Sequence, residues 1–379
     1  MNGGNLQEQL FAWFQWFHRH PEPSGAEHET TARIREILRG IGITVIDTPL
    51  QTGLVARVDG KSEGPVVALR CDIDALPIEE HSGLSYSSGN AGYMHACGHD
   101  FHLTAMLGAA ALLDRRREAL KGTVKLVFQS AEETGVGAKQ VLETGVLDDV
   151  REIFGLHVDD SRAPGVFSVS AGPVSAAVGG FRAVIRGKGG HASVPHECID
   201  PVSAAGQLIV AAQTIVSRST DPFDKVVVSI THVQAGNTWN VIPQEALLEG
   251  TIRTLGTDQF KTVAERLGRI CGGVDRISGA VTEYIWQCGA PSVDNDAALA
   301  DFAAKTAESL GLTVMPAIPN MGGEDFALYQ QRIPGVFFTV GVGSPQTTHH
   351  PGFRANPSPL GAAAGFLAEL GIRSLERTA

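Results

Sequence analysis

Three histidines, a cysteine and an aspartate fall within nine residues, between Met94 and His102. Side chains of all three types can bind a divalent metal. Cys97 and His99 are two residues apart, so they can converge only from a turn or an extended segment, with Gly98 relieving the backbone. Short Cys/His runs also occur as a buried thiol beside solvated histidines. This stretch alone therefore leaves metal binding and plain packing open.

Further candidate ligands follow apolar runs that predict buried strands. The runs at 65–70, 122–129 and 152–156 lead into Asp72 and Asp74, Glu132 and Glu133, and His157. In open α/β sheets, ligands collect where the carboxyl ends of strands meet. Each residue alone could instead be a cap or an exposed acidic turn. Their shared position after strands predicts that they lie at one edge of a sheet.

The adjacent pair Glu132-Glu133 has a physical cost, because neighbouring carboxylates repel unless a cation compensates. On an extended strand the two side chains would point to opposite sides. One could then bind a metal while the other acts as general base on a water, as metal-assisted hydrolysis requires. The alternative is an exposed acidic turn.

The composition narrows the class of protein. A chain of 379 residues favours two domains, and 43% hydrophobic with 19% charged residues describes a folded globular protein. The net charge of −11 argues against a nucleic-acid groove or an anionic membrane surface as partner. No apolar run approaches the ~20 residues of a membrane span. The polar start lacks a secretory signal and the five cysteines are scattered, which favours a reducing cytoplasm.

The order of predicted elements changes near residue 175. Before it, helices at 5–20 and 29–38 precede the strands, and Asp59-Gly60 is a hairpin-like turn signal. From 175 to 289 the pattern is β-α-β-β-α-β, which is typical of a ferredoxin-like module. The chain then returns to the first domain with a helix at 297–310, a strand at 335–341 and a helix at 359–375. We therefore predict a domain of 1–174 and 290–379 that carries an inserted domain of 175–289.

Ten short motifs, in order along nearly the whole chain, resemble the amidohydrolase branch of the two-metal peptidases. That branch includes hippurate hydrolase, auxin–amino acid conjugate hydrolases and N-acyl-diaminopimelate deacetylase, with aminoacylase and carboxypeptidase G more distant. The motifs are Phe17-His18-Arg19-His20-Pro21-Glu22, Asp72-Ile73-Asp74-Ala75-Leu76-Pro77, Met94-His95-Ala96-Cys97-Gly98-His99-Asp100, Ala131-Glu132-Glu133, Gly155-Leu156-His157, Gly187-Lys188-Gly189-Gly190-His191-Ala192, Asn240-Val241-Ile242-Pro243, Gly250-Thr251-Ile252-Arg253-Thr254, Gly323-Glu324-Asp325-Phe326 and His349-His350-Pro351.

The resemblance implies an α/β fold, with a mixed-sheet, three-layer catalytic domain and an inserted ferredoxin-like lid and dimerisation domain. It also implies two divalent ions per subunit: zinc, manganese, cobalt or nickel. The implied metal ligands are Cys97, His99, Glu133, His157 and His349. For the last ligand, His350 remains the alternative to its neighbour, and a cysteine thiolate favours softer metals such as zinc.

Other roles follow from the same resemblance. Glu132 is the implied general base, and Asp74 the aspartate that orients a ligand or the base. His191 would come from the lid domain of a partner subunit and polarise the scissile carbonyl. Asn240 and Arg253 would hold the carboxylate of the substrate, for which the planar guanidinium is suited. Each of these three lid residues could also have an ordinary turn or ion-pair role.

The predicted function is therefore metal-dependent hydrolysis of the amide bond of an N-acyl amino acid, by a cytoplasmic homodimer or tetramer. The partner is a small-molecule substrate, with neither nucleic acid nor membrane expected. A metallo-dipeptidase or aminopeptidase is the alternative within enzymes. A non-catalytic small-molecule binding protein on the same fold is the alternative outside them.

Overall fold

The computed structural model describes residues 3–378, which form two compact units. Unit 1 comprises residues up to 174, 294–318 and those from 325 onward, and unit 2 comprises 175–293 and 319–324. Residues 290–293 and 319–324, which the sequence placed in the first domain, thus cluster with the inserted unit. Within 3–378, no helix is long and apolar enough to cross a membrane.

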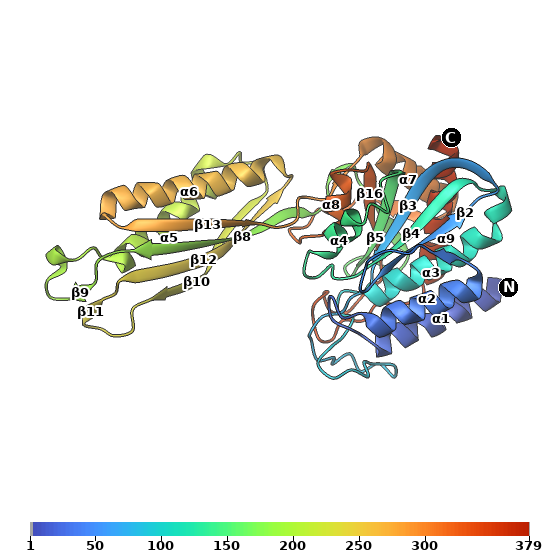
Figure 1. Ribbon diagram of the computed structural model, residues 1–379, viewed down its shortest axis with the longest axis horizontal. Coiled ribbons are helices and arrows are strands. Elements are labelled where there is room, and N and C mark those ends of the chain that lie inside the picture. The colour runs from blue at the N-terminus through green and yellow to red at the C-terminus, as the bar shows by residue number, and fades with distance from the viewer. Residues whose placement is uncertain (1–2, 379) are drawn as a thin grey trace. The chain divides into compact units, whose positions relative to one another are not determined.

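Unit 1 is built on an eight-stranded mixed sheet (Figure 1). Its strands, in spatial order, are β1 (Thr44–Val45), β2 (Leu54–Asp59), β4 (Lys121–Gln129), β3 (Ser62–Asp72), β5 (Val150–Asp159), β16 (Gly335–Gly341), β6 (Val166–Ser168) and β15 (Thr313–Met315). The central strands β4, β3, β5 and β16 are mutually parallel, whereas β2 runs antiparallel to β4. The turn after Asp59 therefore joins no hairpin, because β4 lies between β2 and β3.

Helices cover both faces of this sheet, which confirms the predicted three-layer arrangement (Figure 1). The helices of unit 1 are α1 (Gly3–Arg19), α2 (His28–Ile41), α3 (His99–Arg115), α4 (Gly137–Glu143), α7 (Ala297–Ser309), α8 (Phe326–Gln330) and α9 (Leu360–Thr378). Successive side chains of a strand face opposite sides. Leu69 lies under α9, whereas Arg70 bonds Asp325 at the start of α8. The short helices α4 and α8, which the sequence did not predict, thus cover the second face.

The imidazole of His18 is buried between two carboxylates. Its Nδ1 lies 2.6 Å from Oδ2 of Asp100, and its Nε2 lies 3.2 Å from Oε1 of Glu80. Burial alone would lower the pKa of His18, but these carboxylates raise it to about 9. The imidazolium therefore ties the last turn of α1 to the first turn of α3 and to the loop that follows β3.

This arrangement predicts a pH dependence of stability. Because the pKa of His18 is raised from 6.5 to about 9 on folding, its contribution is complete below pH 6.5 and is lost as the pH rises through 9. We expect this loss to reach about 3 kcal/mol of unfolding free energy. Urea unfolding at several pH values measures it, and the His18→Gln variant should lack this component. Equal pH dependence in both proteins would contradict the assignment.

Unit 2 has the ferredoxin-like order that the sequence predicted. Its four antiparallel strands lie in the order β10 (Val226–Ala235), β12 (Glu245–Leu255), β8 (Ala176–Arg186) and β13 (Val281–Cys288). The helices α5 (Pro201–Ser219) and α6 (Asp258–Ser278) pack on one face of this sheet around a separate core (Figure 1). Two-stranded ladders join β9 (Gly190–His191) to β11 (Val241–Ile242) in unit 2, and β7 (Gly172–Pro173) to β14 (Asp294–Asn295) in unit 1.

Candidate active site

The candidate ligands of unit 1 gather at the carboxyl edge of its parallel strands. Glu132 and Glu133 follow β4, His157 lies near the end of β5, and His349 follows β16. Because these strands are parallel, their carboxyl ends meet at one edge. The loop before α3 brings Cys97 to the same place, where its Sγ lies 3.3 Å from Nε2 of His157.

The turn between Cys97 and His99 depends on the glycine between them. Gly98 has a φ of 83°, a left-handed conformation that disfavours any residue with a Cβ. A Cβ at this position would also stand 2.6 Å from Cγ2 of Val158. His99 is the first residue of α3, so the turn brings its imidazole and the Cys97 thiol to one side. Cys97 and His99 thus converge from a turn, as the sequence predicted.

Two groups of potential ligand atoms meet at the sulfur of Cys97. Within each group the ligand atoms lie within 4.8 Å of one another: Cys97, His99 and His157 in the first, and Cys97, Glu133 and His349 in the second. Nε2 of His99 is 3.9 Å and Nε2 of His349 is 3.4 Å from the same Oε1 of Glu133. The five residues expected as ligands therefore lie together, and His350 belongs to neither group.

The hydrogen bonds of His99 and His157 leave Nε2 of each ring directed into this cluster. His99 Nδ1 contacts Asp74 Oδ1 at 3.2 Å, and His157 Nδ1 contacts the Val158 carbonyl at 2.8 Å. Protonation of Nδ1 leaves Nε2 as a lone-pair donor, the usual state of a metal-bound histidine. Nε2 of His99 and Oε1 of Glu133 are buried without a hydrogen-bond partner among the residues described. Such orphaned atoms fit a divalent cation.

The pKa shifts of the side chains in this cluster also favour a bound cation. Burial raises the pKa of the Cys97 thiol well above its usual range, so a thiolate there needs a cation beside it. Burial also opposes ionisation of Glu133, but His349 and His99 hold the pKa of its carboxyl below the ordinary value. Contact with Glu133 raises the pKa of His349. A thiol and a carboxylate that lie side by side in a largely buried cluster are stabilised when a cation binds between them.

The structure corrects the argument about Glu132 and Glu133. Both residues lie in a turn, not on an extended strand, and Ala131 before them has a left-handed φ of 54°. A carboxylate oxygen of each lies within 4.8 Å of His99 and of the other. The two side chains therefore face the same cluster, and the division of roles does not come from strand alternation.

Asp74 contacts both a candidate ligand and the acidic turn. Its carboxylate is buried, with Oδ1 on His99 Nδ1 and Oδ2 accepting the backbone N–H of Glu133 at 3.1 Å and the hydroxyl of Ser24 at 2.6 Å. Burial opposes ionisation, but the His99 contact holds the pKa of Asp74 below its usual value. The side chain thus orients the imidazole and the turn together.

Sequence reasoning missed the buried guanidinium of Arg70. It donates to Gln129 Oε1 at 2.9 Å, and at 2.8 Å each to Asp72 Oδ2 and Asp325 Oδ1. Asp72 in turn contacts Nδ1 of His102 at 2.6 Å. The available signal was a lone basic residue at the end of an apolar run, two positions before an aspartate. A buried guanidinium is stable only when hydrogen-bond acceptors surround it, and these side chains provide them.

The other two histidines of the opening cluster lie outside the two groups that share Cys97, although His102 forms a further group of potential ligand atoms with Asp72 and His99. His102 accepts the backbone N–H of Val158 at Nε2 (2.8 Å) and contacts Asp72 through Nδ1, so both ring nitrogens are used. Burial lowers the pKa of His102 to about 4, and that of His95 likewise to about 4. Both are neutral, buried residues that pack behind the cluster.

The candidate lid residues lie in unit 2. In the β9–β11 ladder His191 stands opposite Val241, and the Ala192 N–H donates to the Asn240 carbonyl at 3.1 Å. Nδ1 of His191 accepts the N–H of Ser193 at 3.1 Å, so in the neutral ring the proton is on Nε2. Arg253 is on β12, where burial lowers the pKa of its guanidinium.

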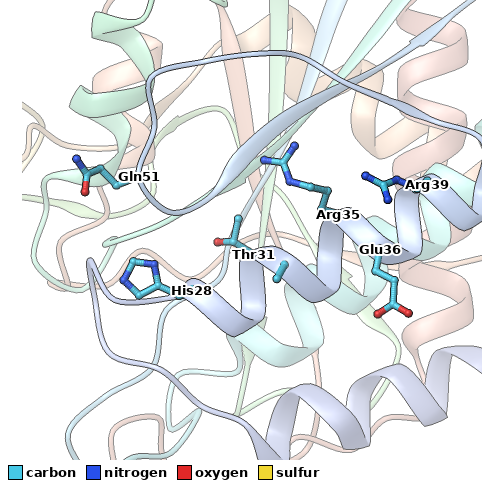
Figure 2. A pocket seen from close by; sticks show the side chains of 7 residues that line it. His28, Thr31, Arg35, Glu36, Arg39 and Gln51 are labelled. Atoms are coloured by element: carbon cyan, nitrogen blue, oxygen red, sulfur yellow. The ribbon is translucent and has the colours of Figure 1, made fainter.

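A surface hollow of about 280 Å³ lies elsewhere, along α2 (Figure 2). Its lining residues are His28, Thr31, Ala32, Arg35, Glu36, Arg39 and Gln51. His28 and Gln51 lie at one end, and Arg35 and Arg39 at the other (Figure 2). None of the candidate ligands or catalytic residues lines it. The candidate ligands of unit 1 therefore lie at the sheet edge and not in this hollow.

A mixed α/β sheet with these candidate ligands at its carboxyl edge is typical of metal-dependent hydrolases. The chain matches the model of peptidase family M20/M25/M40 over residues 68–371, and it belongs to that family. The resemblance noted from the motifs is thereby confirmed.

Similar proteins agree with this assignment. The chain is 46% identical over 360 residues to an N-acetylcysteine deacetylase of Bacillus subtilis (strain 168), covering 95% of each. It is 40% identical over 369 residues to the IAA-amino acid hydrolase ILR1-like 4 of Arabidopsis thaliana, covering 94% of this chain and 84% of that protein. The solved structure of Bacillus subtilis YXEP, described as a dinuclear metal binding peptidase, has a TM-score of 0.91 at 42% identity and covers 99% of this chain and 100% of that one.

Proposed function

We propose that this protein hydrolyses the amide bond of N-acyl amino acids, releasing a carboxylate and a free amino acid. The observation that carries the proposal is the convergence of two groups of ligand atoms on Cys97, with Glu132 beside them. The relatives named as an N-acetylcysteine deacetylase and an IAA-amino acid hydrolase support an N-acyl amino acid as substrate.

We assign the ligands of two divalent ions to Cys97, His99, Glu133, His157 and His349. The dinuclear site of the similar Bacillus subtilis protein supports the number of ions. When bound, such ions acidify water and polarise a carbonyl. A thiolate ligand favours zinc, while manganese, cobalt and nickel remain candidates.

The chain's own residues then move the protons. Glu132 removes a proton from the attacking water and later passes it to the leaving amine. Asp74 keeps His99 and the acidic turn in place, since its two oxygens contact both. Holding a base in position in this way lowers the entropic cost of reaching the transition state.

Three residues of unit 2 complete the proposed machinery. His191 of a partner subunit donates from Nε2 to the oxyanion, consistent with an Nδ1 that accepts the Ser193 N–H. Asn240 and Arg253 bind the carboxylate of the amino acid product. This assignment rests on the family resemblance and on the hydrogen bonds of the His191 ring.

We propose a homodimer formed through unit 2, with a tetramer as the further possibility. One long edge of β10 pairs with no strand among residues 3–378, and such an edge recruits another strand. Val233 on this strand is 51% exposed and Trp239 in the loop after it 92%, so apolar surface accompanies the edge. A monomer in sedimentation at micromolar concentration would contradict the proposal.

The five free thiols favour a reducing compartment, and we place the protein in the cytoplasm.

A substrate panel tests the function. Metal-stripped protein reloaded with zinc, manganese, cobalt or nickel is assayed on N-acetyl amino acids, hippurate, indole-acetyl amino acids and dipeptides. We expect N-acyl amino acids to exceed dipeptides in kcat/KM by about 100-fold, since only the former lack a charged amine to desolvate. Faster cleavage of dipeptides would indicate a dipeptidase instead. Stoichiometric metal without any hydrolysis would indicate a binding protein.

A further inference from the structure

Glu27 is a fully buried acidic residue that the proposed mechanism does not use. It directly precedes α2, yet its side chain does not cap that helix. Oε1 instead accepts the N–H of Gly25 at 2.9 Å and the N–H of Ala131 at 2.8 Å. Burial raises the pKa of the Glu27 carboxyl, so its place in the interior has an energetic cost. A buried carboxylate with this cost indicates a role for the hydrogen bond that it accepts from the Ala131 N–H.

Ala131 has an unfavourable backbone conformation. Among residues 3–378, positive φ angles at residues other than glycine occur only at Ala131 (54°) and His349 (63°). A residue with a Cβ adopts this region only when its surroundings hold it there, and such strain gathers at functional sites. Ala131 stands directly before Glu132, so its φ determines the direction in which the chain enters the acidic turn.

Two buried carboxylates hold the backbone on either side of Glu132. Glu27 accepts the N–H of Ala131 before it, and Asp74 accepts the N–H of Glu133 after it. The segment before α2 supports both contacts, because the hydroxyl of Ser24 donates to the same Asp74 oxygen at 2.6 Å. The backbone on either side of Glu132 is thus held by contacts with residues 104 and 59 positions earlier in the chain.

We propose that Glu27 is a positioning residue that directs the Glu132 carboxylate by holding Ala131 in the left-handed conformation. This inference rests on the proposed function, in which Glu132 is the general base. A residue that only fastened α2 to the sheet would affect folding but not the rate of the folded, metal-loaded enzyme. A positioning residue lowers kcat at unchanged KM, because substrate binding does not require an oriented base.

The test compares two variants of Glu27 with a matched control. Glu27→Ala removes the acceptor of the Ala131 N–H, whereas Glu27→Gln keeps a neutral acceptor oxygen of the same shape. The control is Glu22→Gln, because Glu22 also accepts N–H groups at the start of α2, from Glu29 and Thr30, but does not contact the acidic turn. Each protein is reloaded with zinc, its metal content is measured, and hydrolysis of an N-acetyl amino acid is followed.

We expect kcat per metal-loaded enzyme to fall about 10- to 100-fold in Glu27→Ala, with Glu27→Gln between it and wild type and KM within about twofold. Glu22→Gln should lower the melting temperature but leave kcat unchanged. A Glu27→Ala enzyme at the wild-type kcat, or an equal loss in Glu22→Gln, would overturn the proposal. The Glu132→Ala variant separates the proposed function from the positioning role of Glu27. If it stays active the proposed function fails, whereas if it is inactive and both Glu27 variants are normal, only the positioning role fails.

Discussion

Replacing Glu132 with alanine is expected to abolish hydrolysis while the protein keeps its metal. The carboxylate lies beside His99 and Glu133 at the sheet edge, where it can reach a water held by the ligand groups. A positioned general base contributes about 10²- to 10⁴-fold to the rate, so kcat should fall by that factor. Metal content by elemental analysis should stay at the wild-type level, because the five assigned ligands remain.

The control for this prediction is Glu143→Ala. Glu143 is an exposed acidic residue on α4, where it pairs with Lys139. Its loss removes the same charge from the same region of the chain, and activity should remain within about twofold of wild type. Full activity of Glu132→Ala would show that another group takes the proton, and the assignment of the base would then be wrong.

Replacing Cys97 with alanine is expected to have the largest effect on metal binding. The Cys97 sulfur is common to both groups of ligand atoms, so its loss weakens both proposed sites at once. Removal of a residue that supports a ligand already costs about 10- to 100-fold in affinity, and loss of the ligand itself should cost at least as much. Metal per chain after dialysis should therefore drop well below that of wild type, and hydrolysis should be lost with it.

Cys288→Ala is the matched control, since that cysteine is an exposed free thiol on β13. It should retain wild-type metal content, which excludes non-specific binding by thiols. Added zinc at high concentration should restore part of the activity of Cys97→Ala, because the remaining ligands still bind weakly. Unchanged metal content in Cys97→Ala would mean that the cluster around it serves a purpose other than metal binding.

Local sequence patterns were sufficient to predict most helices and strands and the class of chemistry. Apolar runs predicted β3, β4, β5 and β16, and the polar residues after them indicated one shared edge. This worked because parallel strands align their carboxyl ends whatever their order in the sheet. The Cys97-Gly98-His99 turn was predictable as well, because only glycine accepts its φ of 83° at no cost.

Strand neighbours and long-range contacts were not predictable in this way. The turn at Asp59-Gly60 gave a hairpin signal, yet the place beside β2 is taken by β4, which starts some sixty residues later. Turn residues report only the local bend of the chain, whereas pairing depends on which strand completes the sheet. The same limit explains the error at Glu132 and Glu133, which lie in a turn that a distant residue, Glu27, contacts at Ala131.

The sequence by itself thus indicated the family, through the resemblance of its ordered motifs. Residue types, spacing and periodicity predicted the two-part organisation and the candidate metal ligands. Only the tertiary structure decided how those residues are held. It made the Cys97 sulfur common to two groups of potential ligand atoms and surrounded Arg70 with acceptors. It also placed the carboxylates of Glu27 and Asp74 on the backbone before and after Glu132. The physical reason is that a buried charge is stable only beside its partners, and those partners come from distant parts of the chain.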